Sequence, residues 1–116
     1  MSKPDLNKVK VLTAQGDREL EGIKEELQTG NEGKVRTLAR RAAGFYLSAY
    51  NELTGCGLFG LSFINNLRIL SREESFPEEI RNSAYTLIQK ITQTEITAEQ
   101  AYSDAMNIIN YIRKYL

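Results

Sequence analysis

Apolar residues recur at steps of three and four along most of this chain, and that spacing places them on one face of an α-helix. The clearest stripe lies in residues 32–53 and is formed by Val35, Leu38, Ala42, Phe45, Ala49 and Leu53. Runs of β-branched residues are few, and both prolines stand near the start of a predicted helix. The pattern therefore predicts an all-α fold.

A second stripe begins near Pro4 and is interrupted at residues 15–17. Gly16 weakens a helix in its interior, and Asp17 belongs to the residue types that cap helix N-termini. We therefore expect a bend or a break at this point, with Asp17 capping the second piece. Gly30 indicates the end of that piece and a turn.

Three more helices are predicted in the second half of the chain. Residues 58–70 are apolar nearly all round in their first half, which is typical of a helix buried in a bundle or against a partner. Ser75 is expected to cap the next helix, with Glu78 completing a capping box. Thr97 is expected to cap the last helix in the same way, and this helix continues to the C-terminus.

The predicted helices are joined by short connections of roughly four to six residues, which favour antiparallel neighbours. We expect one domain, residues 1–116, folded as a compact bundle of about five antiparallel helices. The longest strongly apolar stretch, residues 57–64, is far below the ~20 residues that cross a bilayer. No membrane segment is therefore expected.

The composition narrows the possible chemistry. Of 116 residues, 41% are hydrophobic and 26% are charged, as in an ordinary soluble globular protein. No histidine is present, which removes His-based triads and the commonest metal ligand. Cys56 is the single cysteine, so no intrachain disulfide can form, and a reducing, cytoplasmic setting fits best. The sequence predicts a protein that is not an enzyme and binds no metal or cofactor.

The net charge of zero is a cancellation between three segments. Residues 1–33 hold five basic and seven acidic side chains, residues 34–72 hold six and one, and residues 73–116 hold four and seven. The net charges are therefore −2, +5 and −3. A zero total excludes a generally basic, DNA-coating protein, but it does not exclude one basic surface.

The basic side chains of the central segment are the candidate binding residues. Arginine grips phosphate oxygens with a planar fork, and its face stacks on a base. The candidates for contact with a nucleic-acid backbone are Lys34, Arg36, Arg40, Arg41, Arg68 and Arg72, accompanied by Tyr50, Asn51, Asn65 and Asn66. At 100° per residue, Arg36 and Arg40 fall on the side away from the apolar stripe, and Lys34 and Arg41 along one edge. The alternative is a solvated helix face that the acidic flanks neutralise.

Three stretches together resemble a known family: residues 35–43, residues 57–64 and residues 105–115. They are similar to the basic helix, the glycine-leucine helix opening and the terminal aromatic-plus-basic helix of the small helical subunit of type III multisubunit CRISPR effector complexes. The resemblance implies a non-catalytic subunit, present in several copies, that holds the guide–target duplex or a displaced strand by backbone contacts. It implies the same six cations as the contacts, and other subunits of the complex as partners.

A second resemblance implies another class of function. Residues 39–46 and residues 97–106 are similar to HEPN-type helical bundles. Nuclease members of that family use an arginine followed a few residues later by a histidine, which this chain lacks. The resemblance therefore implies an inactive binding protein, such as an antitoxin or an immunity-type partner, whose basic segment meets an acidic protein.

Overall fold

The computed structural model describes residues 3–89 and 96–116, and over these residues it contains five helices and no strand. The helices are α1 (Leu6–Thr29), α2 (Glu32–Thr54), α3 (Phe63–Arg72), α4 (Glu78–Ile88) and α5 (Ala98–Arg113). The prediction of an all-α fold is confirmed. None of the helices in the described ranges is both long and apolar enough to span a membrane.

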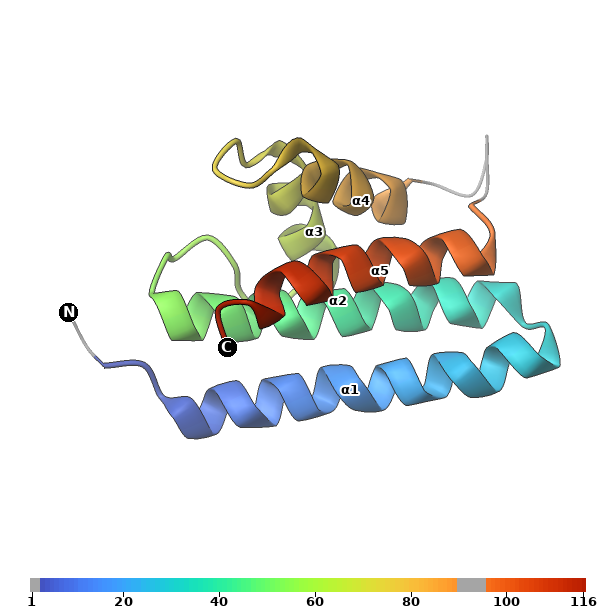
Figure 1. Cartoon of the computed structure of the whole chain (residues 1–116), viewed down its shortest axis with the longest axis horizontal. Coiled ribbons are helices and arrows are strands. Elements are labelled where there is room, and N and C mark those ends of the chain that lie inside the picture. The colour runs from blue at the N-terminus through green and yellow to red at the C-terminus, as the bar shows by residue number, and fades with distance from the viewer. Residues whose placement is uncertain (1–2, 90–95) are drawn as a thin grey trace.

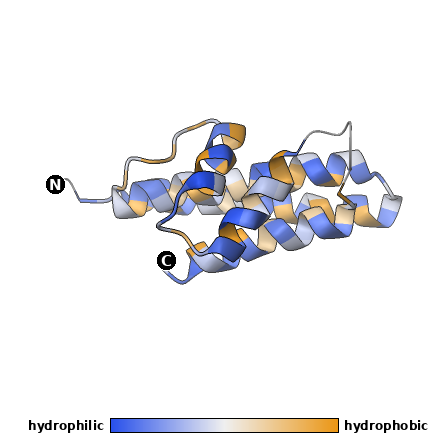
Figure 2. Cartoon of the chain, turned by 90° about the horizontal axis from the view of Figure 1, so that it is seen from above, coloured by the Kyte–Doolittle hydropathy of each residue, from blue (hydrophilic) through white to orange (hydrophobic). Residues whose placement is uncertain are grey.

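Helix α2 lies at the centre of the arrangement. Figure 1 shows α1 and α2 side by side and antiparallel, α5 running along α2 in the same direction, and α3 and α4 stacked on the same side of α2. Figure 2 shows hydrophilic and hydrophobic residues alternating along each helix, as expected when one face of a helix is buried. Because α1, α3 and α5 all pack on α2, this helix is covered on more than one side.

Helix α1 is continuous, so the break predicted at residues 15–17 is wrong. Gly16 lies buried against Tyr46 of α2, and a Cβ atom at this position would lie 2.7 Å from Cδ2 of that ring. Glycine here permits a close approach between two helices and does not end one. Asp17 is not a cap; its carboxylate accepts a hydrogen bond from the Tyr46 hydroxyl at 2.5 Å. Gly30, with a φ of 79°, ends the helix as predicted.

The apolar segment before α3 also differs from the prediction. Residues 55–62 form a non-helical loop in which Gly55 and Gly57 have positive φ values of 67° and 72°, a conformation that favours glycine. Helix α3 begins only after Ser62, whose side chain accepts a hydrogen bond from the backbone N–H of Asn65. The loop buries one apolar residue and exposes another, since Phe59 is 4% exposed and Leu61 is 84% exposed.

Of the N-caps predicted for the last two helices, the one for α4 is wrong and the one for α5 is confirmed. Pro77, and not Ser75, occupies the N-cap position of α4, and it makes no side-chain capping bond. The Ser75 hydroxyl donates instead to Glu73. Thr97 caps α5 as predicted, because its hydroxyl accepts a hydrogen bond from the backbone N–H of Gln100 at 3.0 Å.

Candidate nucleic-acid interface

The structure divides the six predicted cations between two regions. Lys34, Arg36, Arg40 and Arg41 lie on α2, and Arg68 and Arg72 lie on α3. The two groups have different surroundings, so they do not form one basic surface.

On α2, Lys34 and Arg41 face the acidic side chains of α1. The Lys34 ammonium lies 3.1 Å from the Glu26 carboxylate, and the Arg41 guanidinium lies 2.8 Å from that of Glu19. Hydrogen bonds from Lys34 and from Thr29 lower the pKa of Glu26. The lysine and the arginine remain about half exposed, at 56% and 49% of their side-chain areas. Their charges are therefore neutralised locally by the N-terminal segment.

Arg36 and Arg40 lie on the opposite side of α2, away from the apolar stripe as predicted, but this side is covered by other parts of the chain and is not a solvated face. Arg36 is only 7% exposed and donates from Nη1 to the carbonyl of Ile96 at 3.3 Å. Arg40 donates from Nε to the carbonyl of Leu87 at 2.5 Å, in the last turn of α4, where helix carbonyls lack partners within the helix. Burial and the nearby Arg36 charge lower the pKa of Arg40. These two arginines hold the end of α4 and the residue before the N-cap of α5.

Arg68 and Arg72 remain at the surface, on the outer side of α3. They are four residues apart and so lie one turn apart on the same strip of the helix. Helix α3 contains no acidic residue, and within residues 3–89 and 96–116 neither arginine has a carboxylate within 4.0 Å. The Arg68 guanidinium instead donates a hydrogen bond to Oδ1 of the exposed Asn65 at 3.1 Å. We call Asn65, Arg68 and Arg72 the α3 basic face.

Contacts with α2 fix the position of this face. Gly44 of α2 admits the ring of Phe63, and a Cβ atom at Gly44 would lie 2.3 Å from Cδ1 of that ring. The buried amide of Asn66 accepts from the N–H of Gly60 at 2.8 Å and donates to the carbonyl of the same residue at 3.0 Å. Ser48 donates to that carbonyl as well, at 2.7 Å. The loop and the helix start are therefore held in one geometry.

Three of the four residues predicted to accompany the cations have structural contacts. Asn66 is buried in the network just described, and Asn51 accepts from the backbone N–H of Phe59 at 3.1 Å. Tyr50 packs among aromatic rings, at 5.3 Å from the Tyr115 centroid. Asn65 alone lies at the surface beside a predicted arginine.

The same surface has an apolar component, for which the sequence left burial in the bundle and contact with a partner both open. Leu61, Ile64 and Ile69 are 84%, 41% and 36% exposed, respectively. They belong to the loop and to the outer side of α3 that the arginines occupy. Leu61 and Ile64 belong to the stretch expected to be buried in the bundle or against a partner, and nothing in the hydrophobic pattern indicates that the chain leaves the helical conformation before Ser62.

Neither the family models, nor the curated proteins, nor the solved structures contain a match to this chain. The candidate interface therefore rests on its own geometry.

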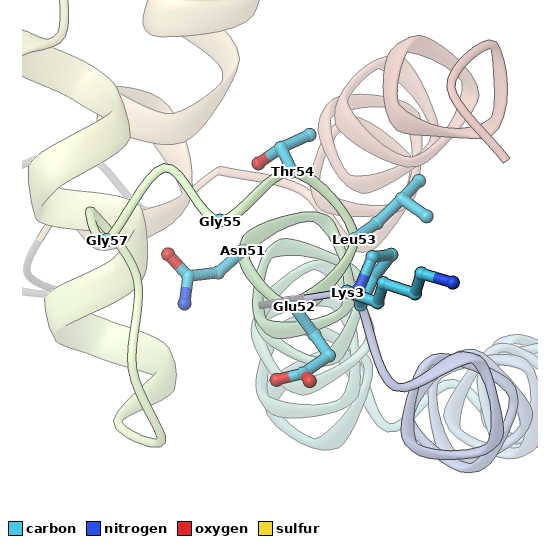
Figure 3. Close-up of a pocket in the computed structure, with 8 residues that line it drawn as sticks. Lys3, Asn51, Glu52, Leu53, Thr54, Gly55 and Gly57 are labelled. Carbon is cyan, nitrogen blue, oxygen red and sulfur yellow. The ribbon is translucent and has the colours of Figure 1, made fainter. Parts of the chain in front are cut away.

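A pocket of about 470 Å³ lies at the C-terminal end of α2. Figure 3 shows the side chains of Asn51 and Glu52 projecting from this end of the helix in different directions. The Glu52 carboxylate is 3.4 Å from the ammonium of Lys8 and also accepts from the backbone N–H of Asp5. Among the residues that the structure describes, no three His, Cys, Asp or Glu side chains are grouped to hold a metal ion.

Proposed function

We propose that this protein is a non-catalytic, cytoplasmic binding subunit of a larger nucleoprotein assembly, and that it contacts nucleic-acid backbone through the α3 basic face. One observation carries the proposal. Arg68 and Arg72 lie one turn apart on a helix without acidic residues, and no carboxylate of the described residues pairs with them. Compared with the six predicted cations, the proposed contact set is reduced to two.

Arginine, asparagine and serine are among the side chains that contact phosphate and sugar. The two arginines lie one turn apart on the same side of α3, and the hydrogen-bonded start of this helix pre-orients them. Two phosphate contacts correspond to a slope of roughly −1.4 in log affinity against log salt for a single strand. Binding by one copy is therefore weak, and several copies or partner subunits would supply the remaining affinity. The resemblance to CRISPR small subunits supports the same arrangement.

The second candidate is a protein-interaction module of the antitoxin or immunity type. The exposed Leu61, Ile64 and Ile69 favour it, because apolar side chains add nothing to phosphate contact. In that case the α3 basic face would meet the carboxylates of a partner protein.

Fluorescence anisotropy with labelled single-stranded RNA and DNA at low and high salt tests the proposal. We expect weak, salt-dependent binding that Arg68→Glu/Arg72→Glu abolishes. Lys34→Glu/Arg41→Glu changes the net charge by the same amount and serves as the matched control, which we expect to retain most of the binding. Circular dichroism checks that both variants are folded.

Two results would overturn the proposal. Undetectable or salt-insensitive binding by the unmodified chain would remove backbone contact altogether. Equal losses in the two charge-matched variants would show that net charge, and not the α3 basic face, determines binding.

A further inference from the structure

The α3 basic face continues directly into an acidic segment. Three glutamates, Glu74, Glu78 and Glu79, follow in the turn after α3 and in the first turn of α4. We call them the elbow acids. All three are exposed, and no cation of the described residues lies within 4.0 Å of them. Two arginines and three glutamates thus lie close together in the chain without pairing inside the monomer.

We propose that two copies of this chain associate about a two-fold axis through α3 and its turn into α4. Arg68 and Arg72 of each copy then face the elbow acids of the other copy. In a two-fold interface the same surface patch meets itself, so the patch must be self-complementary. A patch with cations at one end and carboxylates at the other meets this condition when it is turned around and placed on itself.

The charge order also decides between a second copy and an unrelated acidic protein. An acidic partner that covered Arg68 and Arg72 would bring its own carboxylates beside the elbow acids, where like charges repel. A second copy places opposite charges at both ends of the patch. Complementarity over the whole patch therefore favours self-association.

Apolar side chains extend the patch on the side of the arginines. Ile64 and Ile69 are exposed on the outer side of α3, and Leu61 projects from the loop that Asn66 and Ser48 hold at Gly60. A leucine that is 84% exposed on a pinned loop is arranged to insert into a partner without reordering the loop. Burying these side chains against the partner copy favours association.

The interface has a consequence for the proposed function. Because the same two arginines would contact phosphate, a second copy and a nucleic acid compete for them. This competition rests on the proposed function, but self-association itself does not.

Sedimentation velocity without nucleic acid tests the inference. At low salt we expect the mass to rise with concentration from 13.2 kDa to twice that value, and to fall back when salt is added. The acidic variant Arg68→Glu/Arg72→Glu and the basic variant Glu74→Lys/Glu78→Lys should each remain monomeric. An equimolar mixture of the two should form a dimer again, because one patch is then wholly acidic and the other is mostly basic, with Glu79 as its remaining elbow acid. Lys34→Glu/Arg41→Glu should dimerise like the unmodified chain.

A single monomeric species up to millimolar concentration at low salt would overturn the inference, as would a mixture of the charge variants that fails to associate. The outcome is separable from that of the proposed function. Dimerisation without nucleic-acid binding removes the proposed function alone, whereas nucleic-acid binding by a strict monomer removes the dimer alone.

Discussion

Helices α2 and α3 both carry arginines, yet they use them in opposite ways. On α2, Arg36 and Arg40 donate to backbone carbonyls at Ile96 and Leu87, and Arg41 pairs with a glutamate of α1. On α3, the two arginines point away from the bundle and meet no carboxylate of the described residues. The closely spaced cations of α2 therefore have mostly structural roles, whereas the two arginines of α3 remain exposed.

The position of each helix in the bundle explains this difference. Helix α2 packs against α1 on one side and against α5 and α3 elsewhere, so most of its surface meets other parts of the chain. A short turn at Gly30 returns the chain beside the acidic α1. Helix α3 packs on α2 and α4 and leaves its outer side uncovered. Charge density along a sequence consequently predicts a binding surface only where the helix stays at the edge of the fold.

The largest effect is expected where α3 rests on α2. Gly44→Ala places a Cβ atom within 2.3 Å of the Phe63 ring, so the helix must shift. We expect the free energy of unfolding to fall by about 3 kcal/mol in urea titrations. Gly33→Ala, in the first turn of the same helix, meets nothing closer than 3.8 Å and should be neutral or stabilising by up to ~1 kcal/mol. Equal effects at both glycines would mean that the Phe63 contact does not position α3.

A direct comparison of the two regions comes from Arg40→Ala and Arg72→Ala. The first removes a hydrogen bond from a charged donor to the Leu87 carbonyl and should cost about 2 kcal/mol in the free energy of unfolding. The second removes an exposed side chain with no ion pair and should change stability by less than ~0.5 kcal/mol. Thermal or urea unfolding of both variants measures the difference. A larger loss for Arg72→Ala would reverse the assignment of structural and available arginines.

The sequence predicted the helices well and their spatial roles only in part. Periodicity and local caps identified α2 within one residue of its observed end and located Thr97 at the start of α5. These features depend on neighbouring residues. The role of Gly16 depends on Tyr46, thirty positions away in the chain, and no local rule separates a helix break from a close helix contact.

The candidate site shows the same limit. The sequence named Arg68 and Arg72, but it also named Arg36, which is buried because α2 is covered on the side away from its main apolar stripe. The sequence left open whether Leu61 is buried in the bundle or faces a partner, because its position depends on hydrogen bonds that hold Gly60 to α2 and α3. Tertiary contacts determine which members of a charged or apolar run reach solvent.

Helix α5 carries a buried acidic side chain, Asp104, in contrast to the basic side chains of α2 and α3. Asp104 of α5 is 4% exposed, and its Oδ2 atom has no hydrogen-bond partner among residues 3–89 and 96–116. Burial raises its pKa, although the side chains of Gln100 and Ser83 act in the other direction. Because its pKa is higher in the folded state, this carboxyl makes its full contribution to stability at pH values below its unfolded-state pKa of 3.8. That contribution is lost as the pH rises through the folded-state pKa.

Asp104→Asn should therefore stabilise the protein at neutral pH, by about 1 kcal/mol if the new amide donates one hydrogen bond. The advantage should shrink as the pH falls toward 4, because the wild-type carboxyl is then neutral as well. Urea unfolding of both proteins at several pH values measures this difference. A constant difference at every pH would show that Asp104 does not titrate on folding.

The smallest effect is expected for the surface ion pair between Arg41 and Glu19. A double-mutant cycle with Arg41→Ala and Glu19→Ala should give a coupling of about 0.5 kcal/mol that decreases at high salt, because the arginine is half exposed. The matched cycle with Arg68→Ala and Glu19→Ala should give no coupling, since no contact joins these two residues. A coupling well above 1 kcal/mol for the first cycle would mean that α1 holds the α2 cation firmly. A value near zero would leave Arg41 free to exchange its glutamate for a phosphate, and the contrast between α2 and α3 would then rest on Arg36 and Arg40 alone.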